Sequence, residues 1–338
     1  MTPAVVKSTL VLLAALAVPA AASAQGDRLR IYGVAVELYR HGQVDDALRL
    51  AGSWSPTTLR GDMGRILEDR DQHLAPGMAL LMTELARRNS KASPQQLVIA
   101  ETLVRNLRRH IQNARAFQER WYAYITSLFI AELNPPVARI LVDRGLRLVS
   151  QSPRLQLLSG IAFEMSTYPH VMCLADDCRS RENQRAIVRN LTLAADAYRR
   201  ASALDPHAPE PHLRLGRVLH LLGDRDGARQ ELTEVERVTS NVEFLYLVAL
   251  FRADLSQEAG NLRAAAAEAE RAVNLEPRYQ SARIALAHLS DQLGLADRSR
   301  KIVDEVFRLP PVGDPWWEFR QPAEDVDSLE WLKAYVRK

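Results

Sequence analysis

Hydrophobic positions along most of the chain recur every three to four residues, which is the spacing of one face of an α-helix. Residues 213–232, LRLGRVLHLLGDRDGARQEL, are typical, since two helical patterns flank a polar turn at Gly223. The histidine and aspartates of this stretch belong either to an active site or to the polar face of a helix pair. No second group of matching chemistry lies nearby in the sequence, so the pattern favours a helix pair in an all-α protein.

The same pattern repeats with a period of 34 residues. Gly260 and Gly294 are one period apart, and so are Pro277 and Pro311. Pro206 precedes Pro277 by two periods and three further residues, so one unit carries a short insertion. A fixed period of this length indicates stacked helical units rather than one compact globule.

Each small or polar residue of the repeat has a physical role. Gly216 allows the first helix of a unit to approach its partner closely. Gly223 takes the left-handed conformation that ends the first helix at little cost. Asp224 and Asn261 suit the start of the second helix, and Pro206 stops that helix.

The period and these positions resemble the tetratricopeptide repeat (TPR) family, whose unit is a helix–turn–helix. The resemblance implies an all-α, right-handed α-solenoid of antiparallel helix pairs, with a C-terminal capping helix. It is specific over 154–311, suggestive over 28–58 and 118–153, and inferred over 60–118, where we expect three or four helices without clear repeat residues. The expected organisation is a signal peptide (1–24), degenerate TPR-like hairpins (25–153), a TPR array (154–311) with a cysteine-containing insertion (169–179), and a tryptophan-rich tail with the capping helix (312–338).

The N-terminal residues have the layout of a secretory signal peptide. Lys7 precedes an apolar run from Leu10 to Val18, and Ala22-Ser23-Ala24 forms a small-residue cleavage site. A membrane anchor is the alternative, but it needs about 20 apolar residues. No cysteine follows the run, which argues against a lipid anchor. We expect a periplasmic or secreted protein without a membrane span after signal removal.

Composition excludes several classes of function. The formal net charge is +3, and acidic and basic residues are interspersed, so nothing predicts a nucleic-acid-binding stripe. The sequence has no HExxH, GxSxG, P-loop or GxGxxG motif. We therefore expect no catalytic residue, no metal site and no cofactor.

Cys173 and Cys178 are the only cysteines, within the sequence YPHVMCLADDCRSRENQ. In an exported protein such a pair favours a disulfide, which would pin the inserted loop. Free thiols remain an alternative. A metal site that adds His170 and Asp176 or Asp177 is a further alternative, although the spacing fits no common zinc pattern.

In the TPR family the first helix of each unit lines a concave groove that binds partners. Some members hold a peptide carboxylate there, but the matching positions here supply only one suitable residue, Arg217. The groove instead suggests an extended segment or a helix of a partner protein. The candidate groove residues are Arg217, His220, Phe244, Leu247, Phe251, Ile284, His288 and Asp291.

The C-terminal tail departs from the repeat. From Val326 to Val336 apolar residues recur at helical spacing, which predicts an amphipathic helix that caps the array. Trp316, Trp317 and Phe319 are expected to pack against the last helix pair; the alternative is an aromatic docking site for a partner.

Together these features predict an exported, non-catalytic scaffold that binds another envelope or secreted protein along its groove. One alternative is an enzyme or metal-dependent module centred on the 170–178 loop. Another is a homo-oligomeric structural protein that uses the tryptophan tail as its contact.

Overall fold

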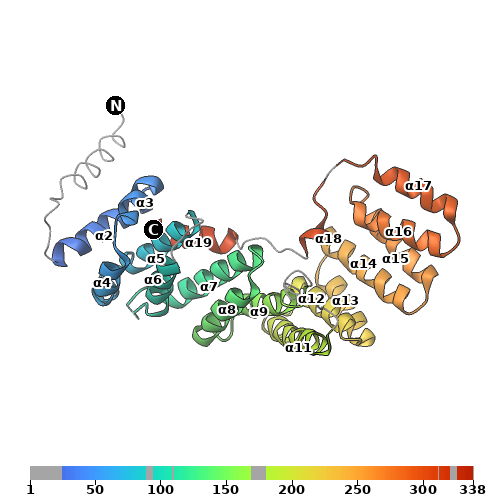
Figure 1. The fold of residues 1–338 in the computed structure, drawn as a ribbon, viewed down its shortest axis with the longest axis horizontal. Coiled ribbons are helices and arrows are strands. Elements are labelled where there is room, and N and C mark those ends of the chain that lie inside the picture. Colours follow the sequence, from blue (N-terminus) through green and yellow to red (C-terminus); the bar gives the residue numbers. More distant parts are fainter. Residues whose placement is uncertain are drawn as a thin grey trace. The chain divides into compact units, whose positions relative to one another are not determined.

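The computed structural model describes residues 25–88, 94–108, 110–168, 180–310, 312–319 and 326–337. Throughout these residues the regular elements are helices (Figure 1), so the predicted all-α architecture is confirmed. The chain forms two compact units: the first runs to Tyr124 and includes the segment from Val326 onward, and the second is Ile125–Asp325. The predicted signal peptide and the Cys173–Cys178 loop lie outside the described residues.

The second unit is a series of helix pairs. From α8 to α17 each helix packs against the next described helix in the chain, and Figure 1 shows consecutive pairs side by side from α12 to α17. The helices are the last part of α7 (Ala114–Ala131), α8 (Pro135–Leu148), α9 (Pro153–Met165), α11 (Arg181–Leu204), α12 (Pro209–Leu221), α13 (Arg225–Val238), α14 (Val242–Glu258), α15 (Leu262–Leu275), α16 (Gln280–Gln292), α17 (Ala296–Val306) and the short α18 (Pro315–Glu318).

The turns inside these pairs are formed as the sequence predicts. Gly223, Gly260 and Gly294 have φ values of +86°, +76° and +77°, a conformation that other L-residues adopt only with strain. The Asp224 side chain accepts a hydrogen bond from the Gly227 N–H at 2.9 Å, which caps α13. These residues set where each first helix ends and each second helix begins.

Close helix approach depends on glycine in the α9/α11 pair. A Cβ atom added at Gly160 would lie 2.3 Å from a ring carbon of Tyr198, which is fully buried on α11. The corresponding position in the next pair, Gly216, is less tight, with Leu232 at 3.2 Å. The glycine at position 160 is therefore required by packing rather than by backbone conformation.

We expect Gly160→Ala to lower the free energy of unfolding by about 1–3 kcal/mol, because the Tyr198 ring must move to admit the methyl group. Urea unfolding measures the loss. Gly33→Ala is the matched control, since Gly33 lies in a helix with no atom within 4 Å of the new Cβ. Equal stability of the two variants would contradict the packing account.

The first unit has less regular pairing. Gly42, with φ of +80°, separates its first two helices in the same way as the glycines of the second unit. The predicted three or four helices within 60–118 are confirmed. The helices are α2 (Gln25–Arg40), α3 (Val44–Gly52), α4 (Pro56–Glu68), α5 (Leu74–Arg88), α6 (Pro94–Arg105), the first part of α7, and α19 (Val326–Arg337).

The predicted C-terminal helix forms, but its position corrects our expectation. α19 packs on α2 and α5 of the first unit, with Leu332 and Val336 fully buried and the Tyr335 ring 5.1 Å from that of Phe117. Phe307, which follows α17 at the end of the last pair where we expected this helix, is 84% exposed. An amphipathic stripe predicts that a helix is buried on one side. It does not specify which other helices cover that side.

A buried carboxylate joins α2 to α4 in the first unit. Asp62 accepts hydrogen bonds from the Arg28 guanidinium at 2.6 and 2.9 Å and from the Tyr32 hydroxyl at 2.8 Å. Hydrogen bonding from Arg28 lowers the pKa of Asp62 below its ordinary value. The ionised form is thus favoured in the folded state.

A lowered folded-state pKa adds stability at neutral pH, and this stability is lost as the pH falls below about 4 and through the folded pKa. We expect Asp62→Asn to be less stable than the wild type at pH 7 and to lose less stability between pH 7 and pH 3. Urea unfolding at the two pH values measures this difference. Parallel losses in both proteins would contradict it.

Candidate peptide-binding groove

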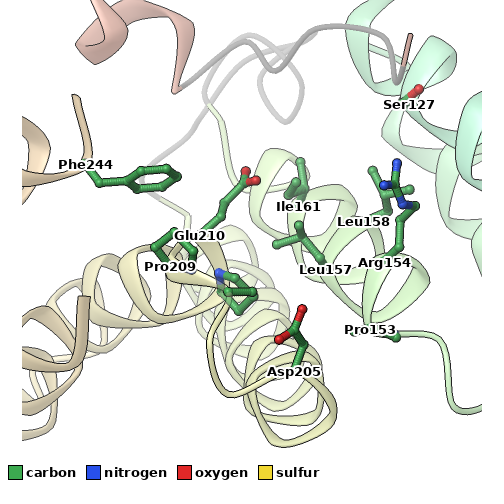
Figure 2. A pocket seen from close by; sticks show the side chains of 12 residues that line it. Ser127, Pro153, Arg154, Leu157, Leu158, Ile161, Asp205, Pro209, Glu210 and Phe244 are labelled. Atoms are coloured by element: carbon green, nitrogen blue, oxygen red, sulfur yellow. The ribbon is translucent and has the colours of Figure 1, made fainter. Parts of the chain in front are cut away.

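The first helices of consecutive pairs surround a cavity of 530 Å³ in the second unit. Its walls come from α9, α12 and α14, with Ser127 contributed by α7. Figure 2 shows Leu157 and Ile161 on one side and Pro209 and Phe244 on the other. A cavity lined by first helices is where the TPR resemblance places a partner.

The cavity wall is mainly apolar, with charged groups of both signs on it. The remaining lining residues include Arg154 on α9, Asp205 at the end of α11 and Glu210 in the first turn of α12 (Figure 2). Such a wall accepts an apolar side chain, and its few charged groups can orient what binds.

Glu210 also connects the cavity to a buried cluster farther along α12. It accepts a hydrogen bond from Arg214 Nε at 2.8 Å, and the Arg214 side chain is buried. Arg217 lies one turn beyond and forms an ion pair with Glu164, whose carboxylate is buried on α9. Glu164 accepts a second hydrogen bond, at 2.6 Å, from the Tyr198 hydroxyl.

The chain's own segment 314–319 lies against this cluster and against α14. The carboxylate of Asp314 accepts hydrogen bonds from the Ser281 backbone N–H at 2.9 Å and from the Tyr246 hydroxyl at 3.2 and 3.3 Å. Burial and the nearby Asp314 raise the pKa of Tyr246 above its ordinary value, so the hydroxyl stays protonated and can donate.

The aromatic end of this segment rests on α12 and α14. The Phe319 ring centre is 4.3 Å from the guanidinium carbon of Arg214 and 5.4 Å from the ring of Phe251. Arg217 lies at 5.7 Å on the same ring, and Trp316 packs on Phe251 at 5.3 Å. Cation–π and aromatic contacts therefore hold this end.

These contacts correct the expectation for the tail aromatics. Trp316 and Phe319 pack on α12 and α14, not on the last pair, α16 and α17. Trp317 points outward and is 58% exposed. The reason lies in Asp314, whose hydrogen bonds to Tyr246 and Ser281 fix where the segment begins.

The structure divides the predicted groove residues into three groups. Arg217 and Phe251 contact segment 314–319, and Phe244 lines the cavity. Leu247 is buried within the array, and His220 is largely enclosed, with Nε2 2.9 Å from the Glu258 carboxylate. The third group is exposed on α16 and comprises Ile284, His288 and Asp291.

Sequence reasoning missed four residues of this site: Glu164, Arg214, Tyr246 and Asp314. Glu164 had a usable signal, because it is the single charged residue in the mostly apolar helix LQLLSGIAFEM. Asp314 had none, since its partner Tyr246 is 68 residues away in the sequence.

Two further features of the described residues concern membranes and metals. None of their helices is long and apolar enough to cross a membrane. Among the same residues no group of three or more His, Cys, Asp or Glu side chains is arranged to hold a metal ion. The 169–179 insertion lies outside them.

Helix pairs with a 34-residue period and left-handed glycine turns form an all-α solenoid, which is the architecture that the sequence resemblance implies.

No family model matches the sequence, and no curated protein matches it. Solved structures of low identity do match. MamA (41-end) from Desulfovibrio magneticus RS-1 is 16% identical, covering 57% of this chain and 94% of its own, with a TM-score of 0.42. PilF of Pseudomonas aeruginosa is 16% identical, covering 66% and 90%, with a TM-score of 0.47. A thermophilic TPR protein of Thermus thermophilus is 18% identical, covering 79% and 98%, with a TM-score of 0.39.

Proposed function

We propose that the protein is an exported, non-catalytic scaffold that binds a segment of another envelope or secreted protein in the groove of its second unit. The observation that carries this proposal is the 530 Å³ apolar cavity formed by α9, α12 and α14. Stacked helix pairs act through such extended surfaces, and an apolar cavity with a few charged groups suits a peptide side chain.

The test is a retention experiment on envelope extract with the purified chain. We expect the wild type to retain one protein, and a Leu157→Ala, Phe244→Ala variant to lose it, because both side chains form the cavity wall. The matched control is Val188→Ala, Leu193→Ala, which removes apolar groups from exposed positions on α11. Equal retention by all three chains would overturn the proposal.

The proposal of export makes a separate prediction about the N-terminus and the two cysteines. In cells, the protein recovered from the periplasmic or secreted fraction should begin at Gln25. Cys173 and Cys178 should resist alkylation until a reductant is added, because exported cysteine pairs are commonly oxidised. Mass spectrometry checks both. An intact N-terminus on cytoplasmic protein would contradict export.

A further inference from the structure

Segment 314–319, DPWWEF, occupies part of the groove in a specific way. Its acidic end lies at the start of α16, and its aromatic end lies on α12. Both ends are buried, whereas Trp317 between them is exposed. The site therefore contacts the side chains at both ends of the segment, which are five positions apart, and Trp316 between them, and it leaves Trp317 exposed.

The acidic position is recognised by groups built into the array. The Ser281 N–H belongs to the first turn of α16, where unpaired backbone donors and the helix dipole favour an anion. The Tyr246 hydroxyl donates to the carboxylate and in turn accepts from the Ala282 N–H at 3.2 Å. A neutral side chain at position 314 would leave these donors without a charge to bind.

The aromatic position is recognised by cations held in place from behind. Glu164 and Glu210 pair with Arg217 and Arg214, so the two guanidinium groups are fixed beside the Phe319 ring. The Phe251 ring closes another side of the same site. A planar aromatic ring makes all three contacts, which an aliphatic side chain does not.

The cavity continues this site along α12. Glu210 lines the cavity and bonds to Arg214, which contacts Phe319. None of the described residues of segment 314–319 lines the cavity. A longer ligand that filled both the cavity and the site of segment 314–319 would make contacts that this segment does not make.

We propose that the groove binds a partner segment with a carboxylate and, five residues later, an aromatic ring, and that the protein's own 314–319 segment competes for this site. The inference rests on the proposed function and names the chemistry of its ligand. A partner that also places an apolar side chain in the cavity displaces the internal segment.

The test uses a fluorescein-labelled peptide with the sequence of residues 312–319, VGDPWWEF, and the full chain. In an Asp314→Ala, Trp316→Ala, Phe319→Ala variant the internal segment loses its contacts with Ser281, Tyr246, Phe251 and the two arginines, and the site is open. We expect this variant to bind the peptide at least tenfold more tightly than the wild type, as measured by fluorescence anisotropy. Trp317→Ala is the matched control and should behave as the wild type, because Trp317 is exposed.

Peptide variants, tested against the open variant of the protein, distinguish specific recognition from non-specific binding. Replacing the aspartate by asparagine, or the final phenylalanine by alanine, should weaken binding at least tenfold. Replacing the second tryptophan by alanine should not. Failure of the open variant to bind the peptide, or equal binding of a scrambled peptide, overturns the inference.

The outcome is separable from that of the proposed function. Peptide binding without any retained envelope protein would support the ligand chemistry and count against the scaffold proposal. Retention of a partner by the wild type, with no peptide binding to the open variant, would overturn this inference alone.

Discussion

Replacing Glu164 by glutamine is expected to lower the free energy of unfolding of the second unit by about 3–5 kcal/mol, which is the usual cost of removing one partner from a buried ion pair. Glutamine keeps the shape and can still accept from the Tyr198 hydroxyl. It removes the negative charge that pairs with Arg217 and lies 3.7 Å from Arg214. Amide hydrogen exchange in α9, α11 and α12 measures the effect directly in this unit.

The control for this variant is Glu210→Gln. Glu210 pairs with the same Arg214, but its side chain is partly exposed, so the expected loss is below about 1 kcal/mol. A loss at Glu164 no larger than that at Glu210 would show that the buried pair contributes little beyond an ordinary surface ion pair.

Replacing Phe251 by alanine is expected to destabilise the second unit by about 3 kcal/mol, because it leaves a cavity where a buried ring was packed. The same change removes the surface on which Trp316 and Phe319 rest. The tryptophan fluorescence should therefore shift toward that of solvent-exposed indole, as Trp316 becomes exposed, at urea concentrations where the helices of the array are still formed. Circular dichroism supplies the second measurement.

Ile284→Ala is the matched control for Phe251→Ala. Both residues lie on first helices and both were predicted to line the groove, but Ile284 is 51% exposed. The expected change is within about 0.5 kcal/mol, as for other surface substitutions. A comparable loss at both positions would mean that burial does not separate their roles.

The repeat explains why so much of the helical fold was predictable. Gly223 forms a turn and Asp224 caps the helix that follows it. Both interactions involve only residues nearby in the sequence, so the local sequence is enough to predict them. Gly160 could also be assigned to a first helix, although the ring that requires it, Tyr198, lies on another helix. The turns and the helix pairing within each 34-residue repeat can therefore be predicted from the period.

The candidate site was less predictable, because it depends on contacts between distant parts of the chain. The family pattern identified Arg217, Phe244 and Phe251 as candidates, and these do lie at segment 314–319 or at the cavity. It did not indicate that the chain's own Asp314 and Phe319 occupy part of the groove. Hydrophobic periodicity shows which face of an element is buried, and it carries no information on what covers that face.

The position of α19 has a consequence for how the chain is made. Helices α2 to α6 of the first unit are synthesised before the second unit, whereas Leu332 and Val336, which are part of the same core, are synthesised after it. The first unit therefore cannot complete its packing until the whole second unit has been made, whereas the helix pairs of the second unit depend on neighbours made shortly before them. A frameshift just before the codons of α19 would damage the first unit and leave the repeat array intact.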